Sequence, residues 1–572
     1  MNYIEKPWLK FYPNNIPHDV TVPSIPLFKL IDNSIVKYGN KTAMIYMGTN
    51  ISYTELGQYI EKAASAFNSI GIKKGSVVAI YLPNCPQFPI CYYAILKLGA
   101  IPTAVSFLFT PREVRQQLSN SRAECIVMLD LMYPKTKPLL DELKINNVVL
   151  ANMTYFLSSV KRTLGNMMGK IPKANIPADA PVHYFEEFMK RNSTDYPKPE
   201  INPNADPATI LYTSGTTGLP KGITLSHYNI VASMHQVMAY AGDLFESEYT
   251  NYLLAFLPFF HVYGQATIMT GGFSLGKTLI VLPNPKIEEL MKLIDKYKIG
   301  LFFGIPASYS IMLKNIKSGK HKLTSLKLCP CGSDKIPKNI ADEFMQLTGA
   351  KLVEGYGLTE ASSGVTGPPV GGEVREGTIG IPMPSTMVAI ADPDRDEFMP
   401  FGEPGEMVVN GPQVMMKVWN DEEKTAKYFS YIGGFKWLRT GDAAYMDNDG
   451  YLHFVERIKD IIKYKSYQVY PKEIEQVISS HPSVYEVAVI GVDTPEKYQI
   501  VKAYVVLKEG YKPTCQDDIL HWCSDNLAEY KVPRAIEFVN ELPKNKIGKV
   551  LKKELKEKEN MATAQVQAQA KT

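Results

Sequence analysis

Cysteine is scarce in this sequence, and the few cysteines are scattered. The 572 residues include seven cysteines, an odd number, at positions 85, 91, 125, 329, 331, 515 and 523. No Cys-x-x-Cys pair occurs, and Cys329 and Cys331 lack the second pair that a zinc site needs. The pattern argues against a disulfide framework and favours a reducing compartment. Glu5, Lys6 and Lys10 argue against a secretory leader, so we expect a cytoplasmic protein.

An excess of charge of one sign is also lacking. The chain has 62 Lys and Arg residues against 58 Asp and Glu residues, a formal net charge of +4, and no long basic block dominates it. We therefore do not expect nucleic acid as a partner. Hydrophobic residues at 45% and charged residues at 21% are typical of a folded globular protein. The length exceeds that of one compact core, which predicts a small number of domains.

One uncharged stretch is long enough to cross a membrane, but its residues argue against a span. Tyr249–Gly276 contains no Asp, Glu, Lys or Arg. Pro258, His261, Gln265 and four glycines interrupt it, and their polar groups would need partners inside lipid. We predict a buried strand–loop–helix segment that lines a pocket.

Helical and strand patterns alternate in the N-terminal half. Apolar residues at helical spacing predict helices at Tyr53–Ser69 and Gln87–Leu98. Apolar, β-branched runs predict strands at Val77–Leu82, Cys125–Leu129 and Val148–Leu150. This alternation is typical of βαβ units around a largely parallel sheet.

The pattern changes twice further along the chain. Short strands dominate residues 378–457, and an α+β pattern follows Arg457. We predict an α/β fold in which residues 1–458 form a large domain of stacked βα sheets, with a β-rich subdomain at about residues 378–457. Residues 459–559 are predicted to form a small, mobile α+β C-terminal domain. Residues 560–572, rich in Ala and Gln, are predicted to be a disordered tail.

A basic amphipathic segment lies in Tyr155–Lys173. The apolar residues recur at helical spacing, and the segment has no acidic residue; they are Phe156, Val160, Leu164, Met167 and Met168. The pattern favours a surface helix packed on the domain. The alternative is a weak peripheral membrane contact, which would suit an enzyme of hydrophobic substrates.

Two segments are candidates for a phosphate-binding loop. Gly271–Thr278 matches the Walker A pattern, but its Lys-Thr opens a β-branched run where a helix should begin. The order is reversed, so we expect no phosphate site there. Tyr212–Gly222 follows an apolar run and is rich in hydroxyl residues and glycines, whose backbone amides can wrap phosphate oxygens.

This second segment resembles the phosphate loop of the adenylate-forming superfamily, which includes acyl-CoA synthetases, luciferases and peptide-synthetase adenylation domains. Further segments similar to that family's motifs follow in order: Leu257–Gly264, Cys331–Asp334, Gly355–Glu360, Leu438–Asp442, Glu456–Asp460 and Leu542–Lys549. The resemblance extends from about Ile51 to Leu555. It implies an enzyme that uses ATP to convert a carboxylate into an acyl-adenylate and then transfers the acyl group to coenzyme A.

The resemblance also implies roles for individual residues. The catalytic residues would be Lys549, Thr359, Glu360 and His261, with Glu360 as the ligand of Mg²⁺. The ATP- and AMP-binding residues would be Thr213, Ser214, Gly215, Thr216, Thr217, Gly218, Lys221, Gly332, Ser333, Asp334, Tyr356, Gly357, Asp442 and Arg457. Lys459 would be the hinge about which the C-terminal domain turns. The CoA-binding residues would be Lys463, Lys465, Ser466 and Tyr467, and the acyl pocket would include His261, Val262, Gln265 and Gly304.

Three residues depart from the family pattern. The family usually has Gly where Ser466 stands, Thr where Asn545 stands and, in some fatty-acyl members, Trp where Gln265 stands. These departures bear on the CoA channel, the surroundings of Lys549 and an aromatic gate.

The opening Lys6–Pro13 and the insertion Tyr133–Lys190 resemble bacterial and archaeal enzymes for long- or medium-chain acids. We therefore expect a fatty-acid–CoA ligase, with fatty acid, ATP and CoA as its partners. The alternatives are an aryl or short-chain acid–CoA ligase, such as the coumarate type, and a non-catalytic acyl- or nucleotide-binding module. The sequence leaves open whether the chain forms a homodimer.

Overall fold

The structure is a computed structural model that describes residues 2–107, 109–168, 174–191, 193–213, 220–319, 321–464, 467–494, 499–512, 516–544 and 550–569. The chain divides into two compact units. The larger unit comprises Asn2–Val388 and Val409–Leu438, and the smaller unit comprises Ala389–Val408 and Arg439–Thr572. The predicted α/β class, with a large N-terminal and a small C-terminal part, is confirmed. The hinge at Lys459 stays a prediction.

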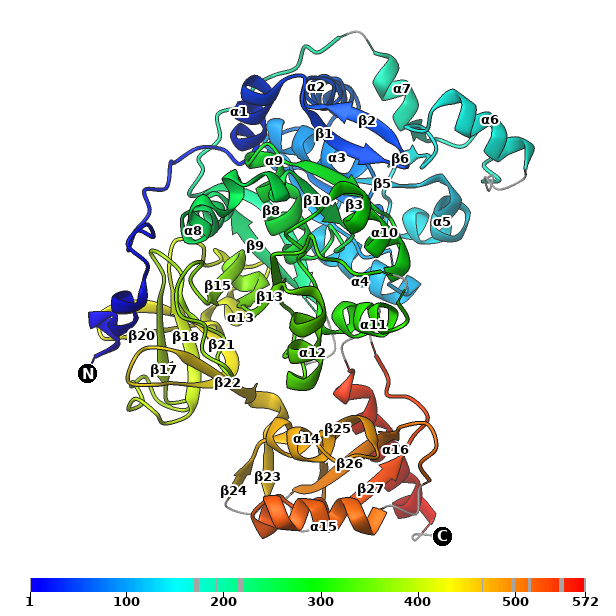
Figure 1. Cartoon of the computed structure of the whole chain (residues 1–572). Coiled ribbons are helices and arrows are strands. Elements are labelled where there is room, and N and C mark those ends of the chain that lie inside the picture. The colour runs from blue at the N-terminus through cyan, green and yellow to red at the C-terminus, as the bar shows by residue number, and fades with distance from the viewer. Residues whose placement is uncertain are drawn as a thin grey trace. The chain divides into compact units, whose positions relative to one another are not determined.

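An eight-stranded sheet organises the first part of the larger unit (Figure 1). Its order is β19-β9-β8-β4-β3-β5-β6-β7, with the strands from β8 to β7 parallel and β9 and β19 antiparallel. The strands are β3 (Val77–Tyr81), β4 (Ile101–Ala104), β5 (Cys125–Leu129), β6 (Asn147–Ala151), β7 (His183–Tyr184), β8 (Pro207–Thr213), β9 (Lys221–Ser226) and β19 (Lys417–Val418). The predicted parallel core is therefore confirmed.

Helices alternate with these strands as the periodicity predicts. They are α1 (Phe28–Tyr38), α2 (Tyr53–Ser69), α3 (Gln87–Lys97), α4 (Pro111–Ser121), α5 (Tyr133–Glu142), α6 (Ser159–Met167), α7 (Phe185–Lys190) and α8 (His227–Ala241). A capping box fixes the start of α2, because Ser52 accepts from the backbone of Glu55 while Glu55 accepts from the backbone of Ser52. In β3 every residue is buried, which explains its unbroken apolar sequence.

A second sheet has the order β10-β11-β1-β2. Its strands are β1 (Thr42–Tyr46), β2 (Thr49–Ser52), β10 (Tyr252–Ala255) and β11 (Thr278–Val281), and a separate parallel pair joins β12 (Leu328–Cys331) to β13 (Lys351–Glu354). Three helices contribute to the same hydrophobic core: α10 (Ile287–Tyr297), α11 (Pro306–Lys317) and α12 (Lys338–Thr348).

The uncharged stretch after Glu248 is buried or half-buried throughout, and it has the predicted order of strand, loop and helix. It forms β10, a loop, a π-helix η6 (Tyr263–Thr270) and the short helix α9 (Gly271–Ser274). Among the described residues, no helix combines the length and the apolar character needed to cross a membrane.

Antiparallel strands follow. One sheet joins β14 (Tyr356–Leu358), β15 (Ser363–Gly367) and β16 (Ile381–Pro382). A five-stranded sheet has the order β17-β18-β21-β20, with β22 paired to β21. Its strands are β17 (Met387–Ala391), β18 (Gly405–Asn410), β20 (Phe429–Ile432), β21 (Phe435–Met446) and β22 (Leu452–Arg457), and the short helix α13 (Glu422–Lys427) precedes β20.

The C-terminal part of the smaller unit is α+β. A hairpin of β23 (Ile462–Tyr464) and β24 (Tyr467–Val469) precedes a three-stranded sheet of β25 (Val484–Asp493), β26 (Gln499–Leu507) and β27 (Ala535–Phe538). The helices are α14 (Pro471–Ser479), α15 (Gln516–Asn526) and α16 (Lys552–Gln569). Helix α16 continues through residues 560–569, where the composition predicts disorder. Alanine and glutamine have high helix propensity, which accounts for the difference.

Candidate active site

The candidate phosphate loop connects two neighbouring strands of the eight-stranded sheet. Thr213 at the end of β8 pairs with Lys221 at the start of β9, so the segment between them begins and ends at one place. The predicted residues of this segment lie outside the described residues; they are Ser214, Gly215, Thr216, Thr217 and Gly218. The Nζ of Lys221 lies 5.2 Å from the centroid of the Tyr428 ring and 3.5 Å from its Oη.

Tyr428 links the lysine to the predicted metal ligand. Its Oη donates to Oε1 of Glu360 at 3.5 Å, the long end of the hydrogen-bond range. The backbone oxygen of Glu360 accepts from the amide of Met415 at 2.8 Å, which fixes the short helix η7 (Thr359–Ala361). The ammonium of Lys221, the hydroxyl of Tyr428 and the carboxylate of Glu360 therefore form a row beside the start of β9. Sequence reasoning missed Tyr428, because nothing in its local pattern distinguishes it from a surface tyrosine.

Mg²⁺ is implied by the family, and the donor set can be tested against it. The described residues contain no cluster of three or more His, Cys, Asp or Glu side chains that could enclose a metal ion. A single carboxylate such as Glu360 fits Mg²⁺ held mainly by substrate phosphates and water. The residues present are thus compatible with a magnesium–nucleotide complex.

The segment that carries Tyr356 and Thr359 is closely packed. Thr359 is buried at the start of η7. At Gly357 a Cβ atom would lie 1.9 Å from the backbone oxygen of Ser363, so glycine is required by the close approach of β14 and β15. The Oγ of Ser363 lies 2.8 Å from Oγ1 of Thr267, which joins this sheet to the π-helix η6.

Backbone hydrogen bonds bring three predicted segments together. The amide of Gly332 donates to the oxygen of Gly304 at 3.2 Å, and the amide of Gly355 donates to the oxygen of Cys331 at 3.2 Å. A Cβ atom on Gly332 would lie 3.1 Å from the ring of Tyr263 in η6. Segments predicted to contact the acyl group, the adenine and the phosphates are thus neighbours. Ser333 and Asp334 continue directly from Gly332, with Ser333 at a φ of 78°.

The segment of His261 and Val262 leads into the π-helix. The Nδ1 of His261 accepts from the amide of Tyr263 at 3.3 Å, and Val262 is buried. Gln265 is also buried, and its Nε2 donates to the backbone oxygen of Phe259 at 3.1 Å. The amide that stands where some family members have Trp therefore stabilises its own turn. π-Helical turns occur frequently at functional sites.

The reversed order at the Walker A match is confirmed. Helix α9 ends at Ser274, Gly276 has a φ of 65°, and β11 begins at Thr278. Lys277 is buried, and its Nζ donates to the backbone oxygen of Phe245 and to Oγ1 of Thr250. This lysine stabilises the fold of its own region.

In the smaller unit, Asp442 and Arg457 face each other on neighbouring strands. They are paired positions of β21 and β22, and Nε of Arg457 lies 2.7 Å from Oδ1 of Asp442. Asp442 is almost completely buried, while Arg457 is partly exposed. The ion pair offsets the cost of burying the carboxylate and fixes its orientation.

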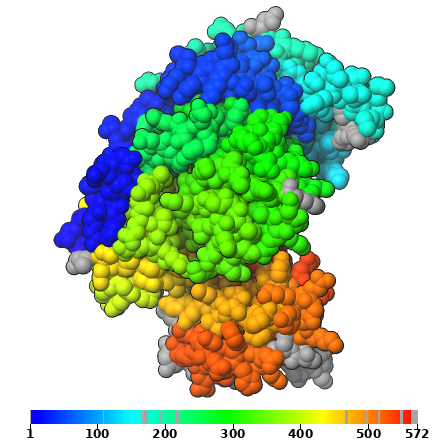
Figure 2. Space-filling view, viewed as in Figure 1, coloured from blue at the N-terminus to red at the C-terminus, as the bar shows by residue number. Residues whose placement is uncertain are grey.

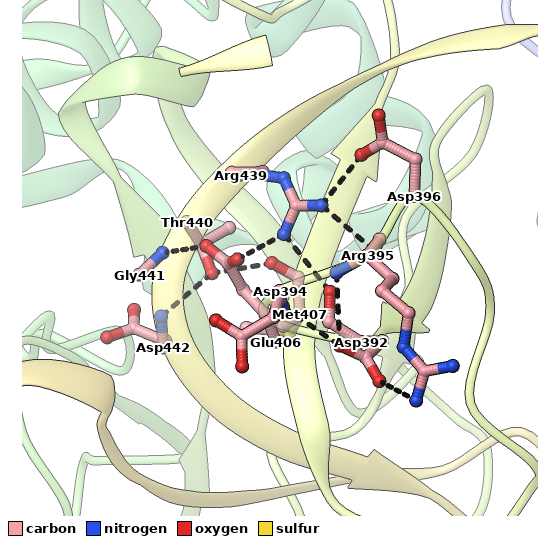
Figure 3. A network of polar contacts seen from close by, with 10 residues as sticks. All are labelled: Asp392, Asp394, Arg395, Asp396, Glu406, Met407, Arg439, Thr440, Gly441 and Asp442. Atoms are coloured by element: carbon pink, nitrogen blue, oxygen red, sulfur yellow. Dashed lines mark hydrogen bonds and ion pairs between the residues drawn. The ribbon is translucent and has the colours of Figure 1, made fainter. Parts of the chain in front are cut away.

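A polar network holds the part of β21 that precedes Asp442 (Figure 3). Oε1 of Glu406 accepts from the amide of Gly441 at 2.9 Å, while its Oε2 accepts from Nη1 of Arg439 at 2.7 Å. Oγ1 of Thr440 accepts from the amide of Asp442 at 3.1 Å and donates to the oxygen of Met407 at 2.7 Å. The amides of Asp442 and of the preceding Gly441 are therefore both held by side chains. Sequence reasoning missed Glu406 because it lies on a different strand, 36 positions before Asp442.

Three of the predicted hinge and CoA-binding residues are described, and they lie on or beside β23 and β24: Lys459, Lys463 and Tyr467. Lys459 is in the short helix η8 (Ile458–Asp460), where burial lowers the pKa of its ammonium and Asp460 opposes that effect. Lys463 lies on β23, exposed, and the backbone of Tyr467 pairs with that of Tyr464.

Besides the residues of the candidate phosphate loop, four residues of the predicted CoA-binding and catalytic segments lie outside the described residues: Lys465, Ser466, Asn545 and Lys549. The segment that includes Asn545 and Lys549 is flanked by Lys544 and Val550. These two residues form an antiparallel bridge, so the two ends of the segment lie together.

A buried charge cluster that the sequence did not predict lies between α14, β22 and α16. The Nζ of Lys552 is 2.8 Å from Oε1 of Glu475 and 3.5 Å from Oε2 of Glu456. Oε2 of Glu456 also accepts from the amide of Lys472, and burial raises the pKa of Glu456 while Lys552 opposes the rise. We call Glu456, Glu475 and Lys552 the α16 charge cluster. It holds the first turn of α16, which begins three residues after Lys549 in the chain.

Comparison with known proteins decides the family. Residues 31–419 match the family described as AMP-binding enzyme, and residues 473–549 match the AMP-binding enzyme C-terminal domain. The chain belongs to the AMP-binding enzyme family. The two matched ranges include the candidate phosphate loop, the segments Leu257–Gly264, Cys331–Asp334 and Gly355–Glu360, and the C-terminal segment Leu542–Lys549.

Relatives of this AMP-binding enzyme match it over nearly its whole length. A long-chain-fatty-acid–CoA ligase of Bacillus subtilis is 37% identical over 97% of this chain and 98% of its own. A protein of the same name from Escherichia coli O157:H7 is 34% identical over the same shares. A Dictyostelium discoideum protein named “Probable 4-coumarate--CoA ligase 1” is 30% identical over 96% of each chain.

Solved structures share the fold. The anthranilate CoA ligase AuaEII in complex with anthranoyl-AMP superposes with a TM-score of 0.80 at 23% identity, covering 99% of this chain and 100% of its own. The ATP-bound RpMatB-BxBclM chimera B3 gives a TM-score of 0.79 at 25% identity, covering 94% of this chain and 99% of its own.

Proposed function

We propose that the chain is an ATP-dependent fatty-acid–CoA ligase. The observation that carries this proposal is 37% identity to a long-chain-fatty-acid–CoA ligase across both chains. The chemistry has two steps. A carboxylate oxygen attacks the α-phosphorus of ATP, pyrophosphate leaves, and the acyl-adenylate forms. The thiol of CoA, losing its proton, then attacks the acyl carbon, and AMP leaves with the bonding electron pair.

The first step brings an anion towards a polyanion, so it needs positive charge around the phosphates. Lys221, beside the end of the candidate phosphate loop, and Lys549 supply that charge in this proposal. Mg²⁺, when bound through Glu360, supplies charge neutralisation of the phosphates. The Lys221–Tyr428–Glu360 row supports this arrangement, because Tyr428 contacts both the cation and the carboxylate.

The other roles concern binding and release. The remaining residues of the candidate phosphate loop hold phosphate oxygens through backbone amides and hydroxyls, and Thr359 donates to the α-phosphate. Tyr356 stacks on adenine beside the 332–334 segment. Asp442 accepts from ribose hydroxyls, and the network of Glu406 and Arg439 keeps its backbone in place. Lys459 acts as the hinge that exchanges Lys549 for the CoA-binding residues between the two steps.

A fatty-acid substrate is supported by the apolar surroundings of the acyl segment. Val262, Phe259 and Leu257 are buried near the π-helix, and Phe302 and Tyr309 line the neighbouring core. The aryl-acid ligase is the alternative substrate class, and a relative named for coumarate supports keeping it in the test. Cytoplasmic location, weak membrane contact and a homodimer belong to the same proposal.

ATP–pyrophosphate exchange with a panel of acids tests the proposal. The panel comprises acetate, octanoate, palmitate, benzoate and coumarate. Exchange with octanoate or palmitate, followed by thioester formation once CoA is added, is the expected result. Exchange with benzoate or coumarate alone assigns an aryl-acid ligase, and the absence of exchange with every acid supports a non-catalytic binding module.

A further inference from the structure

Helix α6 presents a row of apolar side chains that are exposed in the described part of the chain. The residues of the row are spaced as i, i+4, i+7 and i+8, so they share one face of the helix. Their exposed fractions are 67% for Val160, 52% for Leu164, 80% for Met167 and 59% for Met168. Phe156, which precedes the helix in the same series, is buried against the ring of Tyr59. The amphipathic pattern therefore anchors the helix at one end and leaves the rest of its apolar face in solvent.

The helix stands at the outer edge of the larger unit. Figure 1 shows α6 beside α7, away from the sheets, and the cyan segment that contains it lies at the periphery of the space-filling view (Figure 2). The Nζ of Lys161 donates to the backbone oxygen of Met47 at 2.5 Å, which ties α6 to the turn between β1 and β2. Met47 is itself about half exposed. We call Val160, Leu164, Met167 and Met168 the α6 apolar face.

Charge distinguishes this face from an ordinary protein contact. Residues 151–178 contain four basic residues and no acidic residue; the basic residues are Lys161, Arg162, Lys170 and Lys173. Lys161 and Arg162 are exposed on α6, and the other two lie outside the described residues. A helix with apolar residues on one face and cations on its remaining surface is complementary to a surface that combines acyl chains with anionic headgroups.

We propose that the α6 apolar face docks on an anionic lipid surface. Val160, Leu164, Met167 and Met168 enter the boundary between headgroups and acyl chains, while Lys161 and Arg162 remain at the headgroups. The proposal deepens the proposed function, on which it rests for its purpose: a fatty-acid substrate partitions into membranes, and docking places the enzyme at its source.

Co-sedimentation with vesicles tests the docking. The probes are vesicles of phosphatidylglycerol mixed with phosphatidylcholine, and vesicles of phosphatidylcholine alone. The wild type is expected to bind the anionic vesicles, and Leu164→Glu/Met167→Glu to bind them at least about tenfold more weakly, because two apolar contacts become anionic. Arg162→Glu is expected to weaken binding to the anionic vesicles by a similar factor, and high salt to do the same.

A matched control tests whether a glutamate at any exposed apolar position weakens vesicle binding. Val36 on α1 is 87% exposed and lies outside the α6 apolar face, so Val36→Glu is expected to bind vesicles as the wild type does. Pyrophosphate exchange with soluble octanoate is expected to be unchanged in the α6 variants, which shows that they are folded and tests the proposed function separately. The proposal would be overturned if the wild-type protein did not sediment with anionic vesicles, or if the α6 variants bound them as well as the wild type does. A dimer in solution that Leu164→Glu/Met167→Glu dissociates would assign the face to a second copy instead.

Discussion

Replacement of Lys552 by methionine tests the α16 charge cluster. The ammonium of Lys552 is buried between Glu475 and Glu456 at 2.8 and 3.5 Å. Burial alone would lower the pKa of this ammonium, but Glu475 and Glu456 outweigh burial and raise it. Lys552→Met keeps the volume of the side chain and leaves two carboxylates without their shared cation.

The size of the effect follows from the burial of the carboxylates. Breaking a buried ion pair by removing one partner costs about 3–5 kcal/mol, and the partial exposure of Glu475 favours the lower end, about 3 kcal/mol. In a unit of this size, that corresponds to a fall in Tm of roughly 6–12 °C. Removal of Lys552 also raises the pKa of Glu456 further, because the lysine is the main group that opposes the effect of burial.

The dependence on pH has a definite sign. A carboxyl whose pKa is raised in the folded state, such as that of Glu456, binds its proton more tightly there than in the unfolded chain. The contribution of this group to stability is therefore largest at low pH and is lost as the pH rises through the folded pKa. The deficit of Lys552→Met relative to wild type is therefore expected to be larger at pH 8 than at pH 5. Thermal unfolding followed by calorimetry at both pH values measures it.

Lys553→Met is the matched control. Lys553 is the next residue of α16, is exposed, and lies 3.5 Å from Glu557, so its removal is expected to change stability by less than about 1 kcal/mol. Equal stability of Lys552→Met and Lys553→Met would refute the reasoning, as would a deficit that is independent of pH. Adding Glu456→Gln and Glu475→Gln to Lys552→Met is expected to recover part of the loss.

Three further predictions concern residues elsewhere in the chain. Burial lowers the pKa of His227 to about 4, and its Nδ1 accepts from the amide of Leu27. Because the histidine binds its proton more tightly in the unfolded chain, the stability of the protein is expected to fall as the pH is lowered from about 6.5 to about 4. Urea unfolding of His227→Gln should lack that decline. Lys277→Ala is expected to lower Tm yet change the KM for ATP by less than about twofold, because Lys277 contacts its own protein core; a large rise in that KM would restore the Walker A interpretation. Ser466→Gly is expected to speed thioester formation and leave pyrophosphate exchange unchanged if the serine narrows the passage for CoA; slower thioester formation would favour a hydrogen-bonding role instead.

Much of the fold follows from local patterns in the sequence. Helix α2 occupies the predicted range Tyr53–Ser69, and β5 occupies Cys125–Leu129, because burial of one helix face or of a whole strand imposes its own period on the residues. The order of elements at the Walker A match, helix before strand, was predictable because Thr278–Leu282 has the β-branched character of a strand. In all three segments the side chains of neighbouring residues are enough to predict the element.

Contacts between distant segments could not be predicted in the same way. Tyr428 lies 68 residues from Glu360, and Glu456 lies 96 residues from Lys552, and neither pair shares a motif or a spacing. The motif alone identifies Gly357 as a site residue. The reason that this position needs glycine is the backbone oxygen of Ser363, which is close only in the folded chain. The residue pattern of α6 predicts that the helix is amphipathic. Only the structure shows that its apolar face is exposed.

The half-reactions of Lys549→Ala test the central claim most directly. Pyrophosphate exchange with palmitate reports the first step, and thioester formation from supplied palmitoyl-adenylate reports the second. If the chain is a two-step ligase whose lysine serves adenylation alone, exchange should fall at least about a hundredfold, while thioester formation stays within about threefold of the wild type. Equal loss of both activities would contradict the account.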